Sequence, residues 1–168
     1  MAALTVRTAG EGDEDFILAL NAACTPAVGD MTREKYRQLV GWSFRVLIAE
    51  AAIDGDGGAP AGFMILVRPG SAYPSDNYGW FEQKFGRHLY VDRIAVSEAA
   101  RGLGVGRALY EHALQLAADL GEERVTAEVN EDPPNPESMA FHDRLGFRHL
   151  LSRVSGSGKR VAMLERPL

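Results

Sequence analysis

A glycine-rich turn carries the strongest chemical signal in the sequence. It consists of Arg101, Gly102, Leu103, Gly104, Val105, Gly106 and Arg107. Glycine lets the backbone adopt positive φ and approach a ligand without interference from a Cβ atom. An amphipathic segment follows, and a helix N-terminus presents unpaired N–H groups with a partial positive charge. Because Arg101 and Arg107 add full charges, we expect this turn to bind phosphate.

Two other phosphate-binding motifs do not fit the chain. A dinucleotide-binding G-x-G-x-x-G fingerprint that starts at Gly102 would require a glycine where Arg107 stands. The nucleoside-triphosphate motif fails at Gly158, because no glycine lies five residues before it and Arg160 follows Lys159. We interpret these later glycines as part of a hairpin turn.

Apolar and alternating stretches predict strands on both sides of the glycine-rich turn. The expected strands are Leu4–Arg7, Phe44–Ile53, Ala61–Val67, Leu89–Val96, Arg124–Val129, Phe147–Val154 and Arg160–Glu165. The DGDGGAP stretch between the second and third predicts an antiparallel hairpin, and the last two form another around SGSGK.

Helical spacing and capping signals predict the intervening helices. They run from Asp13 or Asp15 to Ala23, from Thr32 to about Val40, from the glycine-rich turn to Gly121, and over Pro136–Leu145. Strand, helix and strand around the glycine-rich turn imply a parallel strand pair. Residues 69–87 show no clean period, so we expect a long loop that is either a functional lid or cover for the sheet.

Composition limits the possible classes of protein. The chain has 168 residues, which suits a single domain over residues 1–168. Its formal net charge of −5 argues against a nucleic-acid-binding protein. No apolar run approaches the roughly 20 residues that span a bilayer. The N-terminus lacks a signal-peptide core, so we expect a cytoplasmic protein without a membrane partner.

Two sequence blocks resemble the GNAT superfamily of acetyl-CoA-dependent N-acetyltransferases. Arg101–Gly106 matches the pattern (Q/R)-x-x-G-x-(G/A) directly after a strand. A second block is similar to N-x-x-A-x-x-x-Y-x-x-x-G-F, with Asn135, Ser138, His142, Gly146 and Phe147 at the five positions. His142 departs from the pattern because the family often has tyrosine there. The resemblance covers residues 88–150 in motif detail and leaves the acceptor undefined.

The resemblance implies an α/β (α+β) fold of one domain. We expect a mixed sheet of about six to seven strands flanked by about four helices, with a central parallel strand pair splayed to admit acetyl-CoA. The pantetheine arm would bond the backbone of Ile94, Ala95 and Val96 like an added strand. The pyrophosphate would be held by the N–H groups of Gly102, Leu103, Gly104, Val105, Gly106 and Arg107, after Arg101.

Further cofactor contacts follow from the second block and its neighbours. Asn135 would reach the cofactor near its thiol end, or act as a helix cap, or do both. Asn130 is a weaker candidate of the same kind. Ser138 would hydrogen-bond the pantetheine or serve as a small packing residue.

Acetyl transfer to an amine needs a neutral amine, a stabilised carbonyl oxygen and a proton donor for the thiolate. We expect a backbone N–H of residues 94–96 at the carbonyl. Asp92 is the first candidate for the base, with Glu128 or an ordered water as alternatives, and an ion pair with a neighbouring arginine as its structural role. His142 would protonate the thiolate or form a polar wall. Cys24 needs no role in direct transfer, and no metal-ligand spacing is present.

The acceptor is expected to be a primary amine of a small molecule or peptide. Tyr78 and Trp80 of residues 69–87 would contact it, and the aromatic and acidic side chains there would suit a cationic amine. Two alternatives are a non-catalytic acetyl-CoA-binding regulatory module and an acyltransferase that uses another acyl-CoA. The chain is expected to be a monomer or a homodimer.

Overall fold

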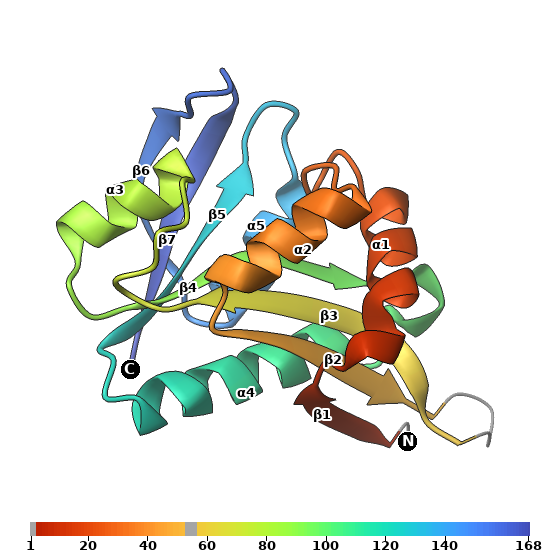
Figure 1. The fold of residues 1–168 in the computed structure, drawn as a ribbon. Coiled ribbons are helices and arrows are strands. Elements are labelled where there is room, and N and C mark those ends of the chain that lie inside the picture. Colours follow the sequence, from red (N-terminus) through yellow and green to blue (C-terminus); the bar gives the residue numbers. More distant parts are fainter. Residues whose placement is uncertain (1–2, 53–56) are drawn as a thin grey trace.

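The computed structural model of the chain describes residues 3–52 and 57–168, and these form a seven-stranded mixed sheet with helices on both faces (Figure 1). The sheet order is β1-β2-β3-β4-β5-β7-β6. β4 and β5 are parallel, and all other neighbours are antiparallel. The strands are β1 (Leu4–Thr8), β2 (Arg45–Ala51), β3 (Ala59–Val67), β4 (Leu89–Val96), β5 (Arg124–Asn130), β6 (Arg148–Val154) and β7 (Arg160–Pro167).

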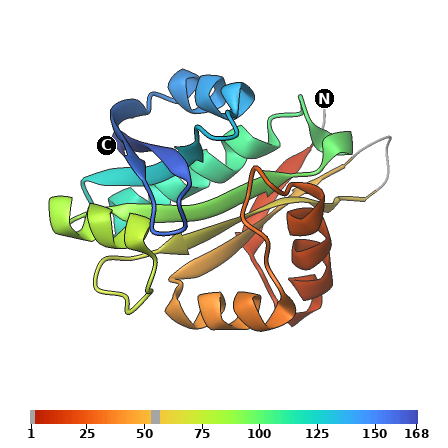
Figure 2. The same ribbon diagram turned by 90° about the horizontal axis from the view of Figure 1, so that it is seen from above.

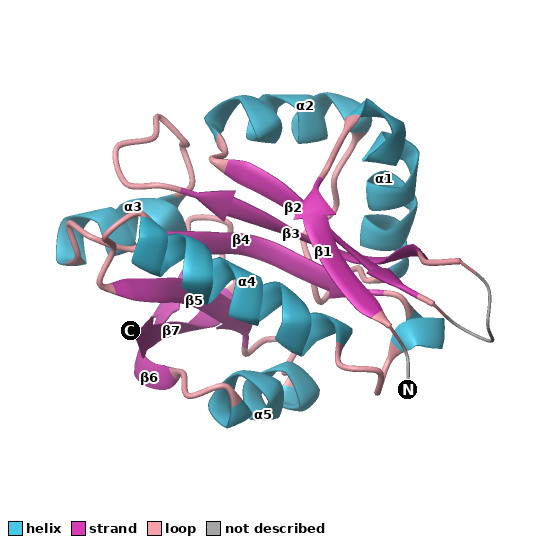
Figure 3. Cartoon of the chain, turned by 90° about the horizontal axis from the view of Figure 1, so that it is seen from below, coloured by secondary structure: helices cyan, strands magenta, loops and turns pink. Residues whose placement is uncertain are grey.

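Helices α1, α2 and α3 cover one face of the sheet, and α4 and α5 cover the other (Figures 2 and 3). Their bounds are α1 (Glu14–Ala23), α2 (Arg33–Trp42), α3 (Asp76–Lys84), α4 (Val105–Asp119) and α5 (Pro136–Arg144). None of these helices combines the length and the apolar character that crossing a bilayer requires.

Alternation along β3 shows how the two faces are filled. Phe63 and Ile65 pack against α1 and α2, whereas Met64 and Leu66 pack in the cluster beneath α4. Successive side chains of a strand point to opposite faces, so a continuous apolar strand buries both sides. The sequence therefore places β3 in the middle of the sheet.

The expected strands, the two antiparallel hairpins and the parallel pair are confirmed. Part of the DGDGGAP turn lies outside the described residues. Thr32 caps α2 as expected, since its hydroxyl oxygen accepts a hydrogen bond from the Lys35 backbone N–H at 3.1 Å. The described residues hold five α-helices instead of about four.

The fifth helix is α3, in the segment that was expected to be a loop. The Ser75 hydroxyl caps it by accepting from the Tyr78 backbone N–H at 3.2 Å. Tyr78 and Phe81 are buried three residues apart, against Tyr90 of β4. Two buried positions in nine residues are too few to produce a visible helical period, so tertiary packing decides this helix.

The central feature of the sheet is an opening between β4 and β5, which diverge in Figure 1. They pair only at Leu89 with Val125 and at Tyr90 with Thr126. A bulge adds to the divergence, because Val91 lies opposite Leu66 and Arg93 lies opposite Ile65, which leaves Asp92 as the extra residue. The expected splayed pair is thus present.

Gly62 of β3 allows α4 to approach the sheet beside this opening. A Cβ atom there would lie 2.9 Å from the Ala95 carbonyl oxygen and 2.9 Å from Val105 at the start of α4. We expect Gly62→Ala to lower the free energy of unfolding by about 1–3 kcal/mol, because backbone cannot yield to the added methyl group.

Denaturant unfolding of Gly62→Ala beside Gly79→Ala tests this expectation. Gly79 lies within α3 and has no atom within 4 Å of the added methyl position. Gly79→Ala should therefore show no decrease in the free energy of unfolding. An equal effect at both sites would contradict the close approach as the cause.

Candidate active site

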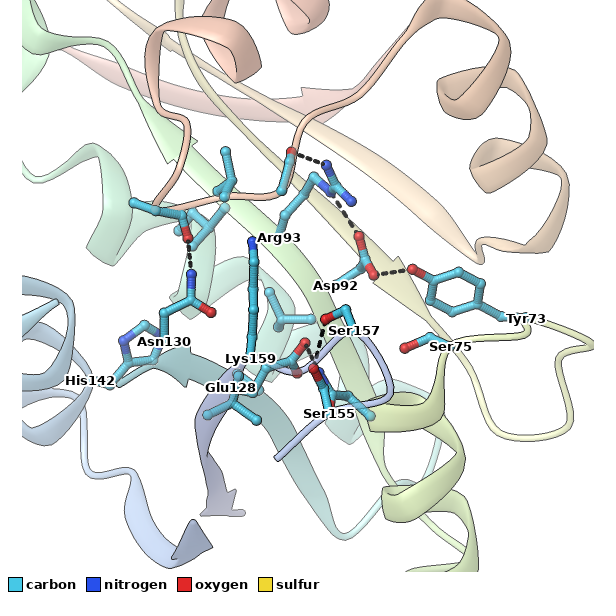
Figure 4. Close-up of a pocket in the computed structure, with 18 of the residues that line it drawn as sticks. Tyr73, Ser75, Asp92, Arg93, Glu128, Asn130, His142, Ser155, Ser157 and Lys159 are labelled. Atoms are coloured by element: carbon cyan, nitrogen blue, oxygen red, sulfur yellow. Dashed lines mark hydrogen bonds and ion pairs between the residues drawn. The ribbon is translucent and has the colours of Figure 1, made fainter. Parts of the chain in front are cut away.

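A cavity of about 240 Å³ lies where β4 and β5 part (Figure 4). Both faces of the sheet contribute to its wall. The residues that matter below are Ala27, Gly29, Tyr73, Ser75, Asn77, Asp92, Arg93, Ile94, Tyr110, Glu128, Asn130, His142, Ser155, Ser157 and Lys159. The structure therefore brings together residues from seven separate segments of the chain.

The unpaired edge of β4 forms one wall of this opening. The Ser97 N–H donates to the Ala61 carbonyl at 2.8 Å, which fixes the alternation of hydrogen bonds between β3 and β4. By this alternation the backbone groups of Ile94 and Val96 point away from β3 and toward the opening. A pantetheine arm with its two amides is complementary to such an edge.

The glycine-rich turn forms a second binding surface at the start of α4. Gly102 and Gly104 have φ of +82° and +85°. The turn has free backbone donors: within residues 3–52 and 57–168, no hydrogen-bond acceptor is paired with the N–H groups of Gly102, Gly104, Val105, Gly106 and Arg107. This donor set fits a pyrophosphate.

The turn also differs from expectation in two details. The Leu103 N–H donates to the Ala100 carbonyl at 3.3 Å, so it is not free for phosphate as predicted. At Gly106 an added Cβ would lie 2.8 Å from the Phe141 ring, so this glycine lets α5 pack on α4. Arg101 and Arg107 extend into solvent, with side chains 61% and 58% exposed, and remain available to an anion.

Glu128 projects from β5 into the cavity (Figure 4). Its carboxylate accepts hydrogen bonds from the Tyr90 hydroxyl at 2.7 and 2.8 Å and from the Asn77 amide at 3.3 Å. Burial raises the pKa of Glu128 to about 8, with a further upward contribution from the charge of Asp92, against the hydrogen bonds that lower it. Glu128 therefore exchanges a proton near neutral pH.

Asp92 faces Glu128 across the opening but is already paired. One oxygen accepts from the Tyr73 hydroxyl at 2.5 Å, and the other accepts from Arg93 Nε at 2.8 Å. Arg93 also donates to the Gly29 carbonyl at 3.0 Å. The ion pair that was the structural alternative for Asp92 is thus present, and it ties the α1–α2 connection to β4.

His142 lies buried on α5 with both ring nitrogens engaged. Nδ1 lies 2.7 Å from the Ser138 carbonyl oxygen, and because a carbonyl only accepts, Nδ1 carries the hydrogen. Nε2 then accepts from the Tyr110 hydroxyl at 2.6 Å. Burial lowers the pKa of His142, so the ring is neutral.

Tyr110 is a cavity residue that the sequence analysis missed. It lies among the apolar positions of α4, where a tyrosine is usually a core residue. The packing of α5 against α4 brings its hydroxyl to His142 beside the cavity.

Two expected cofactor contacts are occupied within the protein. The Asn130 amide donates to the carbonyls of Pro26 at 3.2 Å and Ala27 at 3.4 Å. Asn135 caps α5, since its side-chain oxygen accepts from the Ser138 N–H at 3.3 Å. Asn130 thus holds the α1–α2 connection over the cavity, and Asn135 fixes the start of the helix that carries His142.

The expected acceptor contacts Tyr78 and Trp80 lie outside the cavity, and this corrects the prediction. Tyr78 is buried, and its hydroxyl donates to the Arg68 carbonyl at 2.6 Å. Trp80 packs on Phe81 at a centroid distance of 5.3 Å. The reason is helix α3, which turns these rings to the sheet and to the outer surface.

We predict that Glu128→Gln changes the pH dependence of stability. The folded pKa of about 8 lies above the ordinary value of 4.5, so the folded chain binds more protons between these values and its stability falls as pH rises through them. The neutral amide removes this loss. The stability gain of Glu128→Gln over the unmodified chain should grow by on the order of 1–3 kcal/mol from pH 4.5 to pH 8.

Thermal unfolding across this pH range measures the gain. Glu111→Gln is the matched control, because that side chain is 64% exposed on α4. Water screens an exposed side chain, so the effect of Glu111→Gln should be small beside that of Glu128→Gln. A Glu128→Gln effect that does not change with pH would contradict the raised pKa.

Comparison with known proteins places the chain in a family. The model of the acetyltransferase (GNAT) family matches residues 16–147. The peptidyl-lysine N-acetyltransferase YjaB of Escherichia coli is 26% identical over 166 residues, which cover 96% of this chain and 95% of that protein.

Solved structures share the fold. Ard1 from Thermoplasma volcanium has a TM-score of 0.75 at 18% identity, over 99% of this chain and 98% of that one. The yncA acetyltransferase from Salmonella typhimurium with its cofactor acetyl-CoA has a TM-score of 0.67 at 21% identity, over 99% and 94% of the two chains. The matched region includes β4, the glycine-rich turn and all of α5. The free donors of this turn fit a pyrophosphate. The chain belongs to the acetyltransferase (GNAT) family and is an acetyl-CoA-dependent N-acetyltransferase.

Proposed function

We propose that the cavity between β4 and β5 receives a primary amine of a small molecule or peptide, and that Glu128 is the general base for its acetylation. The observation that carries this proposal is a carboxylate in the cavity wall with a pKa of about 8. A base with this pKa combines a useful fraction of carboxylate at neutral pH with enough basicity to take a proton from an ammonium group.

Acetyl-CoA supplies an activated acetyl thioester when bound. We assign its pyrophosphate to the free N–H groups of Gly102, Gly104, Val105, Gly106 and Arg107. The charges of Arg101 and Arg107 add to this site, since cations at a helix N-terminus oppose the helix dipole unless an anion is present. The edge of β4 at Ile94 and Val96 would align the arm.

Glu128 is a better base than Asp92 in this site. Asp92 holds Arg93 as an ion pair, and losing the carboxylate charge would leave Arg93 uncompensated. Glu128 receives hydrogen bonds only from the neutral groups of Tyr90 and Asn77 among the described residues. Its carboxylate can therefore take a proton from the amine nitrogen, directly or through a water, without breaking an ion pair.

The remaining roles follow from placement. The Ile94 N–H is directed to the opening and would bond the carbonyl oxygen as it gains negative charge. The Tyr110 hydroxyl, which donates to His142 Nε2, would turn its hydrogen to the leaving sulfur and protonate the thiolate, and the tyrosinate would then recover a proton from water. His142 would position Tyr110. Burial raises the pKa of the Cys24 thiol, which keeps it protonated and favours direct attack by the amine over a cysteine-bound intermediate.

We expect Glu128→Gln to lower kcat/KM for the amine by roughly 10²- to 10⁴-fold, the usual contribution of a general base. In the unmodified enzyme, kcat/KM should rise with pH and level off above about 8, because only the carboxylate form accepts a proton. In Glu128→Gln, this rise of kcat/KM with pH should be absent. Thiol release over a range of pH measures it.

Binding of acetyl-CoA by calorimetry is the control and should change little in Glu128→Gln. Asp92→Asn serves for comparison, with a smaller loss expected. If Asp92→Asn loses more activity than Glu128→Gln, the assignment of the base is wrong.

We also expect Tyr110 and His142 to act as one unit. Tyr110→Phe should lower kcat roughly 100-fold with little change in acetyl-CoA affinity, because it removes only the hydroxyl. His142→Phe should cause a similar loss, whereas His142→Gln keeps an acceptor for the Tyr110 hydroxyl and should retain more activity.

The double variant Tyr110→Phe/His142→Phe decides whether the two residues are coupled. Its kcat should equal that of Tyr110→Phe alone. Multiplicative losses would show that His142 acts independently of Tyr110.

A further inference from the structure

Lys159 supplies a cation at the rim of the cavity. It lies in the turn between β6 and β7, directly before β7, and Figure 4 shows its extended side chain crossing the space between Glu128 and Arg93. In the described part of the chain, its ammonium has no ion-pair or hydrogen-bond partner. Arg93, the other cation in the wall, is paired with Asp92 at 2.8 Å.

Two hydroxyl groups lie beside Lys159 on the same turn. Ser155 and Ser157 both line the cavity, and their hydroxyl oxygens are 2.8 Å apart. One of the two hydroxyl groups donates its hydrogen to the other. The second hydroxyl then keeps its own hydrogen free to donate to a ligand. The rim therefore presents an ammonium group and a hydroxyl donor together.

The turn that carries these groups is held in place. The Ser155 N–H donates to the Lys159 carbonyl at 2.7 Å, and the Gly158 N–H donates to the Ser155 carbonyl at 2.9 Å. Gly158 has φ of +84°, which closes the turn. The Gly156 N–H donates to the Asp76 carboxylate at 2.5 Å, which ties the turn to α3. Such backbone support orients the rim groups before a ligand arrives.

The acidic groups around the cavity do not offset this positive charge. Asp76 pairs with Arg153 at 3.6 Å, and Asp92 pairs with Arg93. Glu82 of α3 is engaged with His88 at 2.5 Å. The acidic side chains of residues 69–87 thus have partners within the protein. Glu128, the other carboxylate of the cavity, is the proposed site of the amine, so Lys159 is the unpaired charge left at the rim.

We propose that Lys159, with Ser155 and Ser157, forms a subsite for a carboxylate of the acceptor, so that the enzyme prefers amines that also carry a carboxylate, as amino acids do. This inference rests on the proposed function, in which the amine lies at Glu128. In the register of β5 and β7, Met163 lies opposite Glu128 and Val161 lies opposite Asn130. Lys159 comes two residues before Val161, in the turn before β7, so the carboxylate subsite lies beyond Asn130 on the side of this turn.

A panel of matched acceptors tests the subsite. It contains glycine, β-alanine, 4-aminobutyrate and 6-aminohexanoate, the amide of each, and the alkylamine that lacks the carboxylate. A tripeptide with lysine beside aspartate distinguishes a peptide carboxylate from that of a free amino acid. Initial rates of thiol release are measured with the full chain and with Lys159→Gln, Lys159→Arg and Lys35→Gln.

The acids should have a higher kcat/KM than their amides and alkylamines. Lys159→Gln should lower kcat/KM for the acids by about 10- to 100-fold through KM, the range for a hydrogen bond to a charged group. Amides and alkylamines should change less than about twofold, since they lack the charge that Lys159 binds. Lys159→Arg should retain the preference, and Lys35→Gln on the surface of α2 should match the unmodified enzyme.

Each other result counts against the subsite. Equal rates for acids, amides and alkylamines, or an equal loss for all of them in Lys159→Gln, would overturn it and leave the N-acetyltransferase assignment intact. Thiol release with no member of the panel, despite measured acetyl-CoA binding, would count against the proposed amine site at Glu128 as well.

Discussion

The early end of the pairing between β4 and β5 is the constraint on which the rest of the site depends. A buried strand edge needs partners for its backbone polar groups. The two strands satisfy this requirement for only two residue pairs and then diverge. Each remains fixed by its outer neighbour, since β3 pairs along β4 and β7 pairs along all of β5. The sheet can therefore hold an opening at its centre without losing order, and a ligand with amide groups completes the edge.

The same opening separates the properties of two carboxylates. Asp92 and Glu128 face it from opposite strands. Asp92 lies at a bulge beside Arg93 and is neutralised by a cation. Glu128 accepts hydrogen bonds only from neutral groups among the described residues, and burial is the largest cause that raises its pKa to about 8. Two similar side chains thus acquire different properties from their neighbours: one is held in an ion pair, and the other has a raised pKa.

Cofactor and acceptor regions are coupled through the helices that flank the opening. α4 begins at the glycine-rich turn with free N–H groups and carries Tyr110 to the cavity within two turns. Gly62 permits the close approach of this helix to β3, and Gly106 permits the approach of α5. Small displacements of α4 would therefore move both the phosphate-binding turn and the hydroxyl at His142. The position of α4 on the sheet therefore determines both the location of the glycine-rich turn and the location of Tyr110.

The sequence by itself determined the family, the strands, most helices and the position of the glycine-rich turn at the start of α4. These depend on local properties: alternation, capping residues, and glycines at positions of positive φ. Helix α3 was missed because its two buried rings give too short a period. The Leu103 N–H was assigned to phosphate because spacing does not show which donors a turn uses internally.

Only the tertiary structure decided the partners of each polar side chain. Asp92 and Glu128 are equivalent in sequence terms, and their difference comes from Arg93, Tyr73 and Tyr90, which lie up to 38 residues away. Tyr110 and Lys159 enter the cavity because α5 and β7 pack where they do. The pKa of a side chain, and whether its charge is paired, depend on the groups around it. Those groups come from segments that are distant in the sequence and meet only in the folded chain.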